Sequence, residues 1–140
     1  MIKKYYESDA DLSVFDGKRI AVIGYGSQGR GQALNLKESG LDVVIGVRPG
    51  KSWSAASADG FKVYPVAEAV KMAQVVQILL PDETQAGVDR TEIRPHMTEN
   101  KCLMFSHGFN IRYGGIVPPP FGLQRFCRIS IMSFSMKRTV

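Results

Sequence analysis

The stretch VIGYGSQG (residues 22–29) decides the fold of this 140-residue chain, because its glycines have the spacing G-x-G-x-x-G. The apolar run before it, residues 19–24, is predicted to form a buried strand. The residues after it, 28–39, are predicted to form a helix that Gly40 ends. Glycines alone are common in turns, so it is this order of strand, loop and helix that makes the spacing informative.

Each glycine of the loop has its own physical role. Gly24 permits a tight turn, and Gly26 lets the backbone approach a pyrophosphate. Gly29 lets the helix pack close to the strand, while the free amides at the helix start face the anion. We therefore predict a dinucleotide-binding loop. The alternative is an ordinary glycine-rich turn without a ligand.

The alternation of apolar runs and helical stretches continues along the chain. Further strands are expected at residues 42–47, 62–64, 75–80 and 101–106, and further helices at residues 54–59 and 66–72. Continuous apolar strands separated by helices are typical of a parallel sheet covered on both faces. The predicted fold is a Rossmann-type, doubly wound α/β domain. Three prolines at 118–120 indicate its end, so we expect a domain over 1–120 and a separate tail over 121–140.

Charge and composition exclude several classes of function. The net charge is +5, but residues 1–120 carry 14 Lys and Arg against 13 Asp and Glu, and the basic excess lies in the tail. Without a basic face or a recognition motif, no nucleic-acid partner is expected. No apolar run reaches the length of a transmembrane helix, so no membrane partner is expected either. The polar N-terminus predicts a cytoplasmic protein, and Cys102 and Cys127 are expected to be reduced.

The residues after the second strand favour one cofactor. An NAD site usually has Asp or Glu there, about 20 residues past the first glycines, to accept from the ribose 2′-hydroxyl. Here the residues 46–52 read GVRPGKS without an acid, and Asp42 stands at the strand's start. Arg48, Lys51 and Ser52 offer two cations and a hydroxyl, which suit a 2′-phosphate. We predict NADP(H). The alternative is that Arg48 and Lys51 are solvated loop charges.

Four segments together resemble one enzyme family. YYESDADLSVFDGKRIAVIGYGSQG, GVRPGKSW, ILLPDETQ and FSHGFNI are similar, in this order and in register, to the N-terminal domain of ketol-acid reductoisomerases, also called acetohydroxyacid isomeroreductases. The resemblance implies a place in branched-chain amino-acid biosynthesis. It implies a small 2-hydroxy-3-keto acid substrate, 2-acetolactate or 2-aceto-2-hydroxybutyrate. A magnesium-assisted alkyl shift and a reduction by NADPH would convert it.

The resemblance also implies roles for single residues. Beside the loop glycines Gly24 and Gly29, the residues expected to bind the cofactor are Tyr25, Gly26, Ser27 and Gln28 at the phosphates, Arg48, Lys51 and Ser52 at the 2′-phosphate, and Asp82, Glu83, Thr84 and Gln85 along the adenosine and nicotinamide side. His107 is expected to be catalytic, since an imidazole suits proton transfer near neutral pH. His96 has no such support and is expected to be solvated.

The chain departs from the family's pattern inside its motifs. Arg30, Gly31 and Gln32 stand where the family usually has His, Ala and His, and Arg112 replaces another histidine. Gln77 stands in a strand where an apolar residue is typical, and it needs a hydrogen-bond partner if it is buried.

The resemblance is lost near Pro120, and we expect a truncated or frameshifted reading frame there. The tail over 121–140 is expected to be a last strand or disordered. The family's acidic Mg²⁺ ligands follow in a helical domain, so no metal ligand is assigned here. We expect the chain to bind NADP(H) without completing the reaction alone. Open alternatives are a non-catalytic NADP-binding fragment, a generic dehydrogenase domain completed by a partner chain, and a homo-oligomer formed through an exposed sheet edge.

Overall fold

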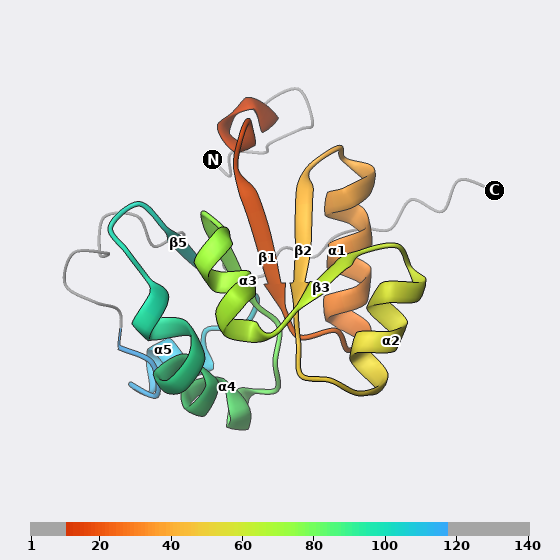
Figure 1. Cartoon of the computed structure of the whole chain (residues 1–140). Helices are drawn as coiled ribbons and strands as arrows, with labels where there is room; N and C mark the ends of the chain where they lie inside the picture. The colour runs from red at the N-terminus through yellow and green to blue at the C-terminus, as the bar shows by residue number, and fades with distance from the viewer. Residues whose placement is uncertain (1–10, 118–140) are drawn as a thin grey trace, which may run out of the picture.

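The computed structural model describes residues 11–117, which form a parallel sheet with helices on both faces (Figure 1). The strands are β1 (Arg19–Ile23), β2 (Asp42–Gly46), β3 (Lys62–Tyr64), β4 (Val75–Ile78) and β5 (Cys102–Phe105). The helices are α1 (Ser27–Glu38), α2 (Lys51–Ala58), α3 (Val66–Met72), α4 (Asp82–Val88) and α5 (Phe109–Arg112), with short turns η2 (Leu12–Phe15), η3 (Asp89–Ile93) and η4 (Arg94–His96). The expectations for residues 121–140 lie outside the described residues.

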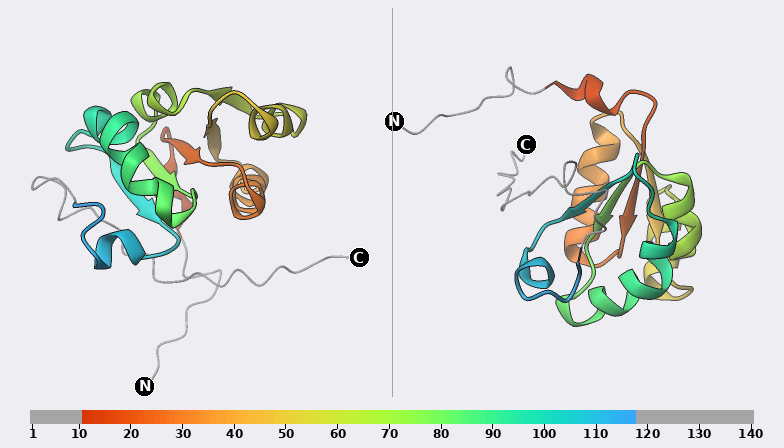
Figure 2. Two further views of the ribbon diagram at one scale, coloured as in Figure 1. Left: turned by 90° about the horizontal axis from the view of Figure 1, so that it is seen from below. Right: turned by 90° about the vertical axis from the view of Figure 1, so that its left-hand side faces the viewer.

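The sheet is buried on both faces, as the apolar strands predict. Alternate residues of β1 point to opposite sides, with Ile23 in a core cluster with α3 and η3, and Val22 in a second cluster. The second cluster includes Ala33 of α1 and Ala56 of α2. Figure 2 shows α1 and α3 on opposite sides of the sheet. The predicted doubly wound α/β fold is confirmed.

The strand order places a ligand-binding edge next to β1. Within the described residues the order is β3-β2-β1-β4-β5, and every neighbouring pair is parallel. The order therefore reverses between β1 and β4. In sheets of this kind ligands bind outside the carboxyl ends of the strands, at the point of reversal. This edge lies at the bottom of Figure 1, where α1 and α4 begin.

Some element boundaries differ from the sequence-based expectation. Helix α2 begins at Lys51 instead of 54, directly after Gly50, whose φ of 149° few other residues adopt. Strand β4 ends at Ile78, and α4 was not predicted because its seven residues, DETQAGV, have no long apolar period. His96, expected to be solvated, lies in η4 and is half-buried. Between residues 11 and 117, no helix combines the length and apolar character that crossing a membrane requires.

Candidate functional site

The glycine loop has the geometry that its spacing predicts. Gly24 has φ of 101°, and a Cβ there would lie 2.8 Å from the carbonyl oxygen of Leu79. A Cβ on Gly29 would lie only 2.3 Å from the carbonyl oxygen of Gly24, so α1 packs against the loop as only glycine allows. Gly26 has open space around it, with no heavy atom within 4 Å of a Cβ. The loop is therefore tight at Gly24 and Gly29, and open at Gly26.

The start of α1 offers amides to an anion. The first hydrogen bond of the helix runs from the Arg30 amide to the Gly26 carbonyl at 2.8 Å. The amides of residues 27–29 precede it and have no partner within the helix. A helix N-terminus with such amides favours a phosphate.

A cleft of about 1010 Å³ opens at the carboxyl ends of β1, β2, β4 and β5. It is lined by all the expected cofactor-binding residues except Gly29, namely Gly24, Tyr25, Gly26, Ser27, Gln28, Arg48, Lys51, Ser52, Asp82, Glu83, Thr84 and Gln85, and by His107. Gly29 is buried against Gly24, so its role is in packing. The structure thus brings together segments that are up to 83 positions apart in the sequence, from Gly24 to His107.

The end of β2 presents positive charge to this cleft. Arg48 and Lys51 are exposed and Ser52 is half-buried, and all three line the cleft. The amides of residues 51–53 precede the first hydrogen bond of α2, from Ser54 to the Gly50 carbonyl at 3.1 Å. Two cations, a hydroxyl and a helix N-terminus therefore lie along the same part of the cleft, a combination that suits an anion.

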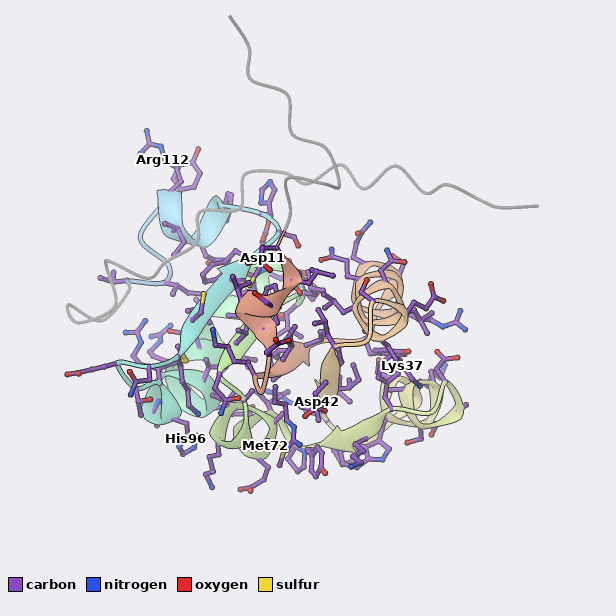
Figure 3. The ribbon with its side chains drawn as sticks, turned by 90° about the horizontal axis from the view of Figure 1, so that it is seen from above. Asp11, Lys37, Asp42, Met72, His96 and Arg112 are labelled. Atoms are coloured by element: carbon purple, nitrogen blue, oxygen red, sulfur yellow. The ribbon has the colours of Figure 1, made fainter. Side chains whose placement is uncertain are left out.

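Asp42 lies at the opposite edge of the sheet, as its place at the strand's start predicts. Figure 3 looks onto that edge and labels Asp42 there. Its carboxylate pairs with Arg19, with the Oδ2 and Nε atoms 2.7 Å apart. Asp42 is therefore not available to a ribose in the cleft.

The LPDETQ and HGFN motifs form one unit at the β4–β5 side of the cleft. The Nδ1 atom of His107 lies 3.1 Å from Oδ2 of Asp82, and the imidazole is 66% exposed. Buried Asn110 donates to the carbonyl oxygen of Asp82 at 2.9 Å and to Oε1 of Gln85 at 3.1 Å. Gln85 in turn donates to the Leu80 carbonyl at 2.8 Å. The unit holds His107 against the cleft.

Two residues of this unit have contacts that the sequence did not indicate. The side chain of Gln85 is 3% exposed and its amide is occupied by protein partners, so it braces the loop. Sequence reasoning did not single out Asn110. The available signal was its position three residues after His107, where a polar residue that follows no apolar period indicates a specific contact.

The hydroxyl of Tyr25 takes part in an ionic network with Asp59 and Arg30. It donates to Oδ2 of Asp59 at 2.8 Å, and Arg30 donates to the same carboxylate from Nε at 2.7 Å and from Nη2 at 3.0 Å. Burial raises the pKa of Tyr25 to about 12, with the bond to Asp59 adding to the effect. Tyr25 was expected to hold the phosphates, and it lines the cleft while its hydroxyl proton is engaged by Asp59. Arg30, a departure from the family's pattern, acquires a role in fixing the loop.

This network predicts a pH dependence of stability. The hydrogen bond from Arg30, followed by that from Tyr25, lowers the pKa of Asp59 from 3.8 to about 2. A carboxylate with a depressed pKa stabilises the folded state fully above its unfolded pKa, and this stabilisation is lost as the pH falls through the folded value. Urea titrations of the unmodified chain and of Asp59→Asn should therefore differ at about pH 5 and converge as the pH falls from about 4 to about 2. A constant difference across that window would contradict the assignment.

Two further departures from the family's pattern are partners of each other. Gln77 on β4 is half-buried and donates from Nε2 to Oε1 of Gln32 on α1. Gln32 also donates to Oγ of Ser106 at 3.2 Å. The partner that Gln77 was predicted to need is therefore Gln32. The same bonds tie α1 to the residue that precedes His107.

Comparison with protein families gives one match over most of the chain. The matching family is described as acetohydroxy acid isomeroreductase, NADPH-binding domain, and it covers residues 14–122.

Solved structures give similar folds. A structure described as an NADH-preferring ketol-acid reductoisomerase from an uncultured archean matches with TM-score 0.80 and 45% identity, over 84% of this chain and 38% of that one. The 3-hydroxyisobutyrate dehydrogenase of Mycobacterium tuberculosis, solved with L-serine, matches with TM-score 0.57 and 27% identity, over 64% of this chain and 31% of that one. A semialdehyde dehydrogenase NAD-binding protein from Cupriavidus necator, at 20% identity, TM-score 0.66 and coverages of 74% and 38%, shares the fold.

Proposed function

The chain belongs to the acetohydroxy acid isomeroreductase family through its NADPH-binding domain, and on that premise we propose that it binds NADPH in the cleft for the reduction of a 2-keto acid. One observation carries the proposal. The cleft joins a phosphate loop, a cationic site at the end of β2 and the His107 unit along a single edge of the sheet. That sequence of groups suits a dinucleotide that lies across the point of strand reversal.

The order of the strands orients the cofactor. The pyrophosphate would lie at the start of α1, beside Gly26, Ser27 and Gln28. The 2′-phosphate would lie on the β2 side, at Arg48 and the start of α2. The nicotinamide would then extend toward β4 and β5, near the His107 unit. When bound, NADPH supplies the hydride.

His107 would transfer the proton that accompanies reduction. Because Asp82 faces Nδ1 at 3.1 Å, it fixes the ring's orientation and favours the proton on that atom. The Nε2 atom is then the one that exchanges a proton with the substrate. Asp82 would thus act on the imidazole, in addition to lining the cofactor cleft.

We propose that the chain on its own binds NADPH without completing the family's reaction, which also requires magnesium. The chain spans 38% of the length of the archaeal structure that it matches. As a member of a biosynthetic family it would act in the cytoplasm on a small 2-hydroxy-3-keto acid. Between residues 11 and 117, the structure has no group of three or more His, Cys, Asp or Glu side chains that could hold a metal ion. The described residues therefore do not fit a two-Mg²⁺ site.

Gly26 provides a direct test of the phosphate loop. Gly26→Ala should leave the melting temperature nearly unchanged, because its Cβ meets no atom and its φ of −80° is ordinary. The new methyl group enters the space proposed for the pyrophosphate, so NADPH affinity should fall at least about tenfold. Gly31→Ala, within α1 and outside the cleft lining, is the matched control and should bind normally. Unchanged NADPH affinity in Gly26→Ala would place the pyrophosphate elsewhere.

Turnover is tested by following NADPH oxidation with 2-acetolactate and Mg²⁺ present. Oxidation that requires the substrate and is lost in His107→Asn would show that the chain completes the reaction alone, against our expectation. Binding of NADPH without oxidation is the expected result for the chain alone. A protein that binds neither NADPH nor NADH would contradict the proposal altogether.

A further inference from the structure

We propose that Glu92 lowers the preference of this chain for NADPH by competing with the 2′-phosphate for the guanidinium of Arg48. The inference rests on the proposed binding of NADPH in the cleft. Glu92 was not among the residues expected from the sequence, since it lies 44 positions from Arg48 in a different element.

The side chains of Arg48 and Glu92 come from two separate segments and meet at the cleft. Arg48 follows β2, and Glu92 belongs to η3, which continues the polypeptide after α4. The Nη2 atom of Arg48 lies 3.4 Å from Oε1 of Glu92. Gly87 and Val88, a short distance before Glu92, line the same cleft. Glu92 therefore stands at the rim of the site, next to the proposed position of the 2′-phosphate.

The exposure of the two side chains indicates which one can move. The side chain of Arg48 is 75% exposed, whereas that of Glu92 is 27% exposed. Arg48 can therefore turn toward a ligand while the carboxylate stays in place. In this structure the guanidinium of Arg48 is paired with Glu92.

The carboxylate of Glu92 and the 2′-phosphate of NADPH carry the same sign of charge, so they compete for Arg48. A 2′-phosphate carries close to two negative charges near neutral pH. If it displaces Glu92, the ion pair is lost, and if it shares Arg48 with Glu92, two anions are brought together. In both cases the affinity for NADPH is lowered. NADH has a neutral 2′-hydroxyl, and Glu92 can accept a hydrogen bond from it or leave it untouched.

Glu92 supplies an acid near the end of β2, where the sequence has none. The acid that usually follows the second strand in an NAD site is missing after β2. Glu92 brings a carboxylate to the same region from another element. The family contains a member described as NADH-preferring, so the balance between the two cofactors varies among its proteins.

The test measures dissociation constants of NADPH and NADH by calorimetry for the unmodified chain and for Glu92→Gln. This change removes the charge and keeps the shape. The expected result is an NADPH affinity about fivefold higher, with NADH affinity changed less than about twofold, and a larger effect at low salt. Glu92→Ala removes the same charge and should shift the ratio in the same direction.

A matched control and a separate stability measurement complete the experiment. Glu38→Gln makes the same charge change at the far end of α1, and it should leave both affinities unchanged. Melting temperatures without cofactor report any loss of folding. An unchanged ratio in both Glu92 variants, an equal gain for both cofactors, or a weaker NADPH affinity would overturn the inference. If the unmodified chain bound no NADPH, the proposed function itself would fail, which is a distinguishable outcome.

Discussion

Replacing Gly29 by alanine is expected to destabilise the folded chain by about 3 kcal/mol, a large part of the stability of a domain of this size. The added Cβ would lie 2.3 Å from the carbonyl oxygen of Gly24 and 2.9 Å from its carbonyl carbon. Both are backbone atoms, so no side-chain rotation relieves the contact. Helix α1 would have to move away from the loop, and the amides at its start would be displaced.

Gly31→Ala is the matched control for this change. Gly31 lies two residues further along α1, and a Cβ there meets no heavy atom within 4 Å. Alanine in a helix is favoured over glycine by up to about 1 kcal/mol, so this variant should be slightly more stable than the unmodified chain. Urea denaturation of the three proteins measures both effects. Equal stabilities for the two alanine variants would show that α1 does not depend on close packing at Gly29.

The double variant Arg48→Gln, Lys51→Gln is expected to bind NADPH about thirtyfold more weakly and NADH about as well as before. Each cation is expected to make a charge-assisted bond to the 2′-phosphate, worth about 1.5–3 kcal/mol when optimal and less at an exposed site. NADH lacks that phosphate, so it loses little. Calorimetric titration of both cofactors into the variant gives the two ratios.

The control for this variant removes the same charges elsewhere. Arg19 and Lys62 begin β1 and β3 at the opposite edge of the sheet, so Arg19→Gln, Lys62→Gln should not change either affinity at moderate salt. A similar loss of NADPH affinity in the control would mean that only the net charge matters. A similar loss of NADH affinity in the test variant would place the two cations at the pyrophosphate.

The sequence supported most of the architecture because its signals are local. The run RIAVI, the glycine spacing and the β-branched segments predict strands and a loop from neighbouring residues alone, and the parallel sheet follows from them. The bounds of β3 and α3 were predicted as the structure has them. Helix α4 was missed because seven residues with an internal glycine carry too short a pattern.

The side-chain partnerships could not be predicted, because each depends on how separate elements pack. Asp59 meets Tyr25 across 34 positions, Asn110 meets Gln85 across 25, and Glu92 meets Arg48 across 44. None of these pairs has a spacing that a helix or strand period would reveal. They also determine which predicted site residues have a side chain that is engaged by a protein partner.

The central claim is that the end of β2 forms a site for a 2′-phosphate. The most direct measurement is the ratio of the NADPH and NADH dissociation constants of the unmodified chain, determined by calorimetry under the same conditions. We predict tighter binding of NADPH, because Arg48, Lys51 and Ser52 line the cleft there, beside the start of α2. Equal affinities, or tighter binding of NADH, would contradict the account.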